Sequence, residues 1–198
     1  MQKYELIFRK MAKVYVFLAN GFEDVEALIP VDVLRRGGVE VVTVSVVEDS
    51  QVVESAHKVQ IVADAMFEDC DFADADLLVL PGGMPGASNL NAHDGVRQAL
   101  LRQAAAGKRF AAICAAPLVL GGLGLLRGKR ATCYPGFEQT LDGATYTGDL
   151  CTVDGMVTTG EGPAAAFPFA YTLLEQLVSK QIADQIAEGM RFKHLMAR

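Results

Sequence analysis

One cysteine stands where a strand-like run of residues meets a helix-like run. Cys114 lies in Ala-Ala-Ile-Cys-Ala-Ala-Pro, directly after an apolar run that predicts a buried strand. Small neighbours permit a sharp turn that holds a side chain away from the backbone. The positive end of a helix dipole would also favour the thiolate and lower the pKa of the thiol. These features favour a reactive nucleophile, but a small buried core residue is equally compatible with the position.

Glu26 is the acidic residue that we select for chemistry. It falls in the first turn of a predicted helix, next to Glu23 and Asp24, which are better explained as capping and dipole-stabilising residues. Glu26 by itself would have the same explanation. However, Pro30 lies four residues later and has no N–H to donate to the Glu26 carbonyl group, and a proline inside a helix costs about 3 kcal/mol. Such a local violation marks a functional site or a kink.

A third candidate is the glycine pair in Pro81-Gly82-Gly83, which follows another apolar run. Glycines let the backbone approach a ligand and expose N–H groups. An N–H from this turn and the N–H of Ala115 would together form an oxyanion hole beside the sulfur. The alternative is an ordinary tight turn. The turn is not a phosphate-binding loop, because no Gly-Lys-Ser/Thr follows it and the chain has no Gly-x-Gly-x-x-Gly.

Alternating strand and helix patterns must position these loops. Apolar runs predict strands at 13–19, 39–47, 77–80 and 109–113, with a hairpin at 51–62 and short strands at 130–133, 144–147 and 156–159. Amphipathic or small-residue segments predict helices at 24–36, 94–107 (capped by Asp94), 115–126, 163–178 and 180–191. The alternation predicts an α/β fold, with a mostly parallel sheet and helices on both faces. Ligands of such folds bind beyond the carboxyl ends of the strands, so loops 20–26, 81–86 and 114–117 should meet there.

The overall composition limits the classes of function. The chain has 198 residues, of which 51% are hydrophobic and 21% charged, and its formal net charge is −6. Such a chain has enough apolar residues for a sizeable core. The negative charge argues against a nucleic-acid partner or a polybasic membrane patch. Residues 1–10 precede a second methionine, and we expect them to be a loose extension before a single domain at 11–198.

The four cysteines and three histidines limit the metal and redox chemistry. No Cys-x-x-Cys pair is present, which leaves zinc ribbons and thioredoxin-type pairs without support. The scarcity of histidine argues against a histidine-built metal site, so we predict no metal. The longest uncharged stretch, 110–126, is interrupted by proline and glycine, which argues against a transmembrane helix. We therefore expect a cytoplasmic protein with reduced thiols and no membrane partner.

Three separate motifs together resemble a known family. LPGGMPGASNL, AAICAAP and GFEDVEA are similar to the ThiJ/PfpI superfamily, in the branch that holds the DJ-one and YajL proteins. The resemblance extends from about residue 11 to the last predicted helix. It implies a flavodoxin-like three-layer sandwich and a homodimer. It also implies that Cys114 is the reactive cysteine, Glu26 the pocket carboxyl group, and Gly83 and Ala115 the source of the oxyanion-side amides.

The chain departs from the pattern of this superfamily at several positions. The residue after Cys114 is alanine, whereas the protease-like branch has histidine there, so a Cys-His peptidase would lack its base. Tyr134 occupies the position of a histidine in animal members, and tyrosine is a poor base at neutral pH. Glu161 replaces the usual arginine or glutamine and would disfavour an anionic ligand. We include Tyr134, Gly82 and Glu161 as candidate pocket residues.

The resemblance implies an enzyme that acts on small reactive carbonyl compounds without a metal or organic cofactor. In this hypothesis Cys114 adds to a glyoxal-type aldehyde, and Glu26 moves a proton between adjacent carbons. The same chemistry would remove early glycation adducts. The alternative is a redox-responsive stress protein or chaperone, in which Cys114 is oxidised to the sulfinate and turnover is small.

Overall fold

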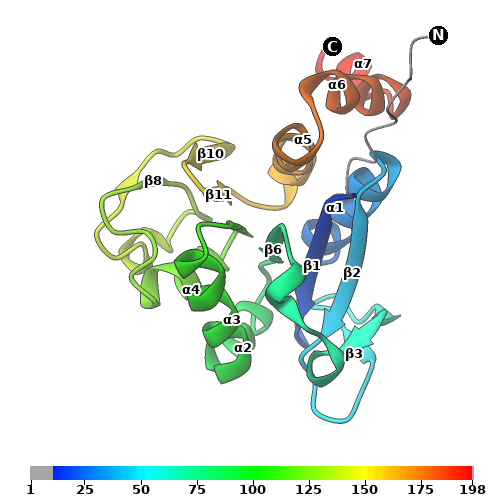
Figure 1. Cartoon of the computed structure of the whole chain (residues 1–198). Helices are drawn as coiled ribbons and strands as arrows, with labels where there is room; N and C mark the ends of the chain where they lie inside the picture. Colours follow the sequence, from blue (N-terminus) through cyan, green and yellow to red (C-terminus); the bar gives the residue numbers. More distant parts are fainter. Residues whose placement is uncertain (1–10, 198) are drawn as a thin grey trace, which may run out of the picture.

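In the computed structural model, which describes residues 11–197, a seven-stranded sheet forms the framework (Figure 1). The order of its strands is β10-β11-β7-β6-β1-β2-β5, and only β10 runs antiparallel to its neighbour. The predicted extension at residues 1–10 lies outside the described part of the chain. The strands are β1 (Lys13–Leu18), β2 (Glu40–Ser45), β5 (Ala65–Met66), β6 (Leu77–Leu80), β7 (Arg109–Ile113), β10 (Cys151–Asp154) and β11 (Val157–Gly160).

The central strands form where the sequence is continuously apolar. β6 has the sequence LLVL and is buried along its whole length, as is β1 after its first residue. Parallel strands that are covered on both faces need such runs instead of alternating polar residues. Val14 of β1 pairs with Leu77 of β6 on one side and with Val41 of β2 on the other. The four long strands predicted from the sequence are confirmed within two residues at each end.

The crossover directions place helices on both faces of the sheet. Helix α1 connects β1 to β2, and this step leads toward the β5 edge of the sheet. Helix α3 lies between β6 and β7, and this step leads in the opposite direction, toward the β10 edge. Because such connections are right-handed, α1 and α3 lie on opposite faces. α5 packs beside α1, and α2 contacts both α3 and α4 (Figure 1). The predicted three-layer α/β sandwich is confirmed. The helices are α1 (Asp24–Arg36), α2 (Gly86–Ala92), α3 (Asp94–Ala105), α4 (Pro117–Gly122), α5 (Ala166–Leu177), α6 (Lys180–Gly189) and α7 (Phe192–Met196).

Smaller elements lie outside the main sheet. The predicted hairpin at 51–62 is confirmed as an antiparallel pair of strands. A second pair is parallel and lies between α4 and β10 in the sequence. Among residues 11–197 no helix combines the length and the apolar character that crossing a membrane requires. The remaining elements are β3 (Val52–Glu54), β4 (Gln60–Val62), β8 (Arg130–Ala131), β9 (Thr145–Tyr146) and the 3-10 helices η1 (Phe67–Asp69), η2 (Phe72–Asp74), η3 (Glu138–Thr140) and η4 (Pro163–Ala165).

Three predictions about helices and their caps are wrong. The helix predicted at 115–126 is only the short α4, because turns occupy the residues before and after it. Asp94 does not cap α3; the His93 side chain does, through an imidazole Nδ1 that accepts the Val96 N–H at 3.1 Å. The helix predicted at 180–191 ends at Gly189, and α7 follows it. Arg191, between them, has a left-handed backbone with φ of 64°.

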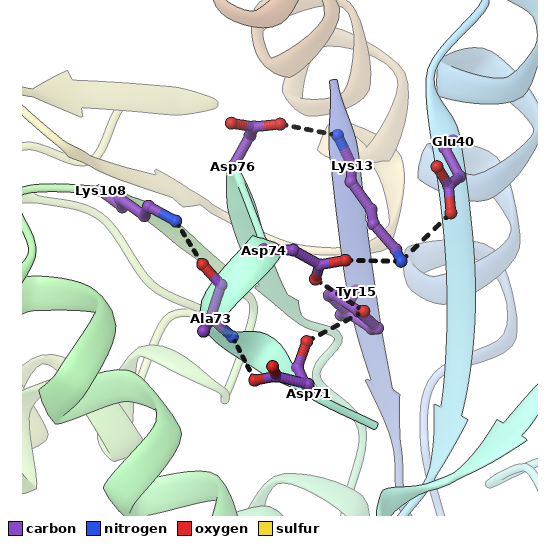
Figure 2. A network of polar contacts seen from close by, with 8 residues as sticks. All are labelled: Lys13, Tyr15, Glu40, Asp71, Ala73, Asp74, Asp76 and Lys108. Carbon is purple, nitrogen blue, oxygen red and sulfur yellow. Dashed lines mark hydrogen bonds and ion pairs between the residues drawn. The ribbon is translucent and has the colours of Figure 1, made fainter. Parts of the chain in front are cut away.

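A polar network fastens the amino end of β1 to the strands beside it (Figure 2). Lys13 Nζ lies 2.8 Å from Asp74 Oδ2 and 3.3 Å from Glu40 Oε1 in β2. The hydroxyl of Tyr15 donates to Asp74 Oδ1 at 2.9 Å, and the Lys13 N–H donates to Asp76 Oδ2 at 2.8 Å. The hydrogen bond with Asp74 raises the pKa of Lys13. This network connects β1 to β2 and to the segment just before β6, at the end of the sheet away from the predicted site.

The two glycines at the end of α4 provide a matched test of packing. A methyl group at Gly121 would collide with the backbone carbonyl oxygen of Thr140, whereas one at Gly122 would lie 3.8 Å from the nearest atom, Asn91 Oδ1. We expect Gly121→Ala to lower the free energy of unfolding by about 1–3 kcal/mol through overpacking. Gly122→Ala should be neutral or stabilising by up to about 1 kcal/mol. Urea unfolding of both variants measures the difference, and equal values would contradict this packing.

Candidate active site

The three predicted loops meet at the carboxyl ends of neighbouring parallel strands. Cys114 directly follows β7, Gly82 lies in the turn after β6, and Glu26 lies in the first turn of α1, which follows β1. These strands are adjacent in the order β7-β6-β1. The expectation that they converge at one edge of the sheet is therefore confirmed.

Cys114 has an unusual backbone conformation that the surrounding chain holds in place. Its φ is 63°, in the left-handed region that non-glycine residues rarely adopt, at a cost on the order of 1 kcal/mol. Its N–H donates to the carbonyl oxygen of Gly160 at 3.0 Å, and its own carbonyl oxygen accepts the Tyr134 N–H at 2.8 Å. These two hydrogen bonds stabilise the sharp turn after β7. The side chain is largely buried, with 8% of the residue surface exposed.

The Glu26 carboxyl group is fully buried beside this thiol. Its Oε2 accepts the Gly82 N–H at 2.9 Å, and the carboxyl group also interacts with the Cys114 thiol. The other oxygen, Oε1, completes no regular hydrogen bond among the described residues. A methyl group on Gly82 would lie 2.6 Å from both the Cys114 Cβ and the Glu26 Oε2. The thiol and the carboxyl group can therefore approach one another only because residue 82 has no side chain.

Backbone amides surround the sulfur. The N–H groups of Gly83 and Ala115 both interact with Cys114 and favour its anionic form. Gly83 has a φ of 84°, and its backbone is packed against that of Phe22 and Glu23, which leaves no room for a side chain. The two amides lie where a negative charge on sulfur, or on an oxygen attached to a carbon bound to it, would be stabilised.

Burial, and for Cys114 also the charge of Glu26, control the ionisation of this pair. Burial raises the pKa of Glu26 to about 7, against the opposing effects of the Cys114 thiol and the Gly82 N–H. Burial and then the neighbouring Glu26 charge raise the pKa of the Cys114 thiol to about 12. The expectation of a thiol pKa lowered by a helix dipole is wrong, because burial and the neighbouring Glu26 carboxylate raise the pKa, while α4 begins only at Pro117. At neutral pH the pair carries at most one negative charge, and Glu26 can accept the thiol proton.

The structure brings together most of the predicted site residues, but not all of them. Tyr134 lies beside Cys114, because its N–H donates to the Cys114 carbonyl oxygen. Tyr134 has 46% of its surface exposed, and its ring lies against Gly162. Glu161 follows β11 and donates its N–H to the Leu150 carbonyl oxygen at 3.0 Å. No hydrogen bond or ion pair connects its carboxylate to Cys114 within residues 11–197. Cys70, Cys133 and Cys151 are free thiols whose pKa values are raised by burial.

Sequence reasoning missed two features of this region. One is Gly160, whose carbonyl oxygen accepts the Cys114 N–H, since the predicted strand ended one residue earlier. The other is His57, which lies at the tip of the β3–β4 hairpin with its Nδ1 2.7 Å from Asp24 Oδ2 and 3.7 Å from Glu23 Oε1. Neither contact has a signal in the local sequence pattern, because the partners lie more than thirty residues apart.

Comparisons with known proteins agree over most of the chain. A model of the DJ-1/PfpI family matches residues 12–176. Protein DJ-1 homolog B of Arabidopsis thaliana is 40% identical over 177 residues, 88% of this chain and 40% of that protein. The chain spans less than half the length of the two Arabidopsis relatives that it matches. The glutathione-independent glyoxalase DJR-1.2 of Caenorhabditis elegans is 32% identical over 170 residues, 85% of this chain and 89% of that protein.

Solved structures show the same architecture. A DJ-1 superfamily protein of Salmonella typhimurium aligns with a TM-score of 0.87 and 36% identity, over 91% of this chain and 98% of its own. Oxidized DJ-1 of Toxoplasma gondii aligns with a TM-score of 0.86 and 36% identity, over 90% of this chain and 97% of its own. The fold described above is therefore that of the DJ-1 structures.

The raised pKa of Glu26 predicts a pH-dependent cost to stability. Between pH 4.5 and about 7 the folded chain keeps the Glu26 proton while the unfolded chain loses it, so stability falls as pH rises through this window. The shift corresponds to a cost on the order of 3 kcal/mol at pH 8. Glu26→Gln should therefore be more stable than the wild type at pH 8, with the advantage vanishing near pH 4.5.

Urea unfolding of the wild type and the variant at both pH values measures this difference. The exposed Glu188 of α6 offers a matched control, since Glu188→Gln should leave the pH profile of the wild type unchanged. A Glu26→Gln variant that is destabilised equally at both pH values would refute the assignment of a buried, protonated carboxyl group.

Proposed function

Since the chain belongs to the DJ-1/PfpI family, we propose that it converts reactive 2-oxoaldehydes to 2-hydroxy acids through Cys114 and Glu26, without a cofactor. The observation that carries this proposal is the contact of a buried carboxyl group, with a pKa of about 7, with the thiol of Cys114. A group that both accepts and returns protons near neutral pH suits a proton shuttle. The glyoxalase name of the Caenorhabditis elegans relative supports the same reaction class.

The first step forms a bond between sulfur and carbon. The Cys114 sulfur attacks the aldehyde carbon of the substrate while the Glu26 carboxylate takes the thiol proton. The negative charge that develops on the aldehyde oxygen is stabilised by the amides of Gly83 and Ala115. Glu26 then returns the proton to this oxygen, which gives a hemithioacetal and restores the carboxylate.

The second step moves a proton between the two former carbonyl carbons. Glu26 removes the proton from the carbon bound to sulfur and delivers it to the oxygen of the neighbouring ketone, which gives an enediol. Glu26 then takes the hydroxyl proton from the sulfur-bound carbon and delivers it to the second carbon, which gives a 2-hydroxy thioester in which one carbon has been oxidised and the other reduced. Water cleaves the thioester, releasing the 2-hydroxy acid and the free thiol. No external oxidant or reductant is needed. On an early glycation adduct the Cys114 sulfur would displace the amine or thiol from the carbon that carries the hydroxyl group, the leaving group would take the thiol proton, and the same hemithioacetal would result.

The surroundings of the sulfur argue against a peptidase. Ala115 follows the cysteine, so no adjacent histidine is available as a base. The His93 imidazole caps α3, and His57 pairs with Asp24. Glu26 is therefore the base that we assign to Cys114.

A second candidate function is redox sensing through the same thiol. Peroxide would oxidise Cys114 in two steps to the sulfinate, releasing one water at each step. Protonated Glu26 and the amides of Gly83 and Ala115 would hydrogen-bond the new oxygens. One solved relative, from Toxoplasma gondii, is described as oxidized DJ-1, which is why we keep this candidate.

Turnover of methylglyoxal distinguishes the two functions. We expect lactate to form in a buffer free of amines and thiols, and the rate to fall on the order of 10²-fold or more in Cys114→Ser and in Glu26→Gln. Cys70→Ser is the matched control and should keep the wild-type rate. Turnover that persists in Cys114→Ser would contradict the proposed enzyme. No turnover in the wild type, with two oxygens added at Cys114 by mild peroxide, would favour the sensor.

We also propose that the chain forms a homodimer. Val25 and Leu28 of α1 are about 40% exposed, and Val62 of β4 is 71% exposed, so apolar surface is available for a second copy. Light scattering should give twice the 21.2 kDa mass of one chain at micromolar concentration. Leu28→Asp should shift the mass toward the monomer. Leu195→Asp, in the exposed α7, should not. A wild-type mass near that of one chain would exclude the dimer.

A further inference from the structure

We infer that Glu23, Asp24 and His57 form a binding site for a divalent metal ion of the Zn²⁺ class. One ligand atom from each of these residues lies within 4.8 Å of the other two. The scarcity of histidine argued against a metal site, but the fold places one of the three histidines against two carboxylates. This inference goes beyond the proposed reaction and does not depend on it, because neither Cys114 nor Glu26 is among the ligands.

Two separate elements are fastened together at this site. Glu23 and Asp24 stand at the start of α1, and His57 stands in the turn of the β3–β4 hairpin. The Ala56 N–H donates to the Phe22 carbonyl oxygen at 2.8 Å, which connects the hairpin to the loop before α1. The His57 N–H donates to the Ser55 Oγ at 3.2 Å and so shapes the turn. The backbone of His57 is therefore placed next to the carboxylates by contacts other than those of its imidazole.

The distances suit an ion held by three ligands. His57 Nδ1 lies 2.7 Å from Asp24 Oδ2 and 3.7 Å from Glu23 Oε1. Two ligand atoms bound to one Zn²⁺ at about 2.1 Å with tetrahedral angles lie about 3.4 Å apart. The two measured separations fall on either side of this value. The ion would replace the proton between Nδ1 and Oδ2, and the His57 side chain, 66% exposed, is free to move by the small distance required.

The Glu23 carboxylate does not make the capping hydrogen bond that the sequence predicted, and one oxygen of Asp24 lacks a regular hydrogen-bond partner among the described residues. Glu23 occupies the N-cap position of α1, but its side chain makes no capping hydrogen bond. One oxygen of Asp24, Oδ1, is buried and completes no regular hydrogen bond in the described part of the chain, although the Ser55 hydroxyl acts on this carboxylate. Both side chains are largely buried, with 16% and 18% of their surface exposed. Acidic oxygens in such a position gain from a cation.

The charges favour a divalent ion. Two carboxylates and a neutral imidazole sum to −2, which an ion of charge +2 cancels, whereas a proton on His57 cancels only half. The neighbouring cation Lys58 is directed away, since its Nζ binds Glu54 Oε1 at 2.9 Å. An imidazole nitrogen with two carboxylate oxygens suits Zn²⁺ and similar transition metals better than Mg²⁺ or Ca²⁺. Three protein ligands leave a fourth position for water.

The site lies next to the Cys114 pocket in the chain and in space. The Glu23 N–H donates to the Gly82 carbonyl oxygen at 3.0 Å, and the Gly82 N–H donates to Glu26. A bound ion would therefore fasten the hairpin to the start of α1, whose first turn also carries Glu26.

Titration calorimetry with zinc chloride on the full chain at pH 7.5, with reduced thiols, tests the site. We expect one Zn²⁺ per chain, and an affinity reduced about tenfold or more in His57→Ala and in Asp24→Asn. His194→Ala is the matched control, since His194 is an exposed histidine in α7, and it should bind as the wild type does. Excess Mg²⁺ should not displace the ion. Because His57 is exposed, its variant tests the site even if Asp24→Asn fails to fold.

The visible absorption of Co²⁺ tells this site from binding at a cysteine. We expect bands from nitrogen and oxygen ligands, without thiolate-to-cobalt charge transfer, that are lost in His57→Ala and kept in Cys114→Ser. Charge-transfer bands that disappear in Cys114→Ser would place the metal at the sulfur and overturn the inference. Equal Zn²⁺ affinity in the wild type and His57→Ala, or no binding at millimolar Zn²⁺, would show that His57 and Asp24 form an ion pair only.

Discussion

The contact between a largely buried thiol and a fully buried carboxyl group determines the character of this molecule. Burial disfavours charge on both Glu26 and Cys114, and the Glu26 charge further opposes ionisation of the thiol, whereas the thiol hydrogen bond favours the Glu26 carboxylate. The pair consequently exchanges protons near neutral pH, although neither group would do so in water. The contact requires a residue without a side chain between them, a requirement that Gly82 meets.

The rest of the fold holds this contact in place from three directions. The carboxyl ends of β7, β6 and β1 bring the loops together, and the hydrogen bonds of Cys114 to Gly160 and Tyr134 maintain its left-handed backbone. At the other end of β1, the network around Lys13 and Asp74 fastens the sheet (Figure 2). The left-handed backbone conformation of Cys114 is strained, and such strain persists only where the surrounding contacts fix the conformation.

The loop between β1 and α1 serves two polar sites with different solvent exposure. Glu26 points into the protein, where burial makes its carboxyl group neutral part of the time near pH 7. Glu23 and Asp24, in the residues just before it, keep part of their surface in solvent and meet His57. Neighbouring acids in one short segment thus differ in chemistry because their burial differs, and a hydrogen bond from Glu23 to Gly82 connects the two sites.

Local patterns in the sequence were sufficient for the five inner strands of the sheet, α1, the β3–β4 hairpin and the convergence of Cys114, Glu26 and Gly82, but not for the edge strands β5 and β10. These features follow from apolar periodicity and from the rule that parallel strands end at a common edge. Tertiary structure alone decided the direction of the thiol pKa, since it depends on burial and on a carboxylate far away in the chain. It also decided that His93 caps α3 and that His57 meets Asp24, because a hairpin closes a separation of 33 residues that no local pattern records.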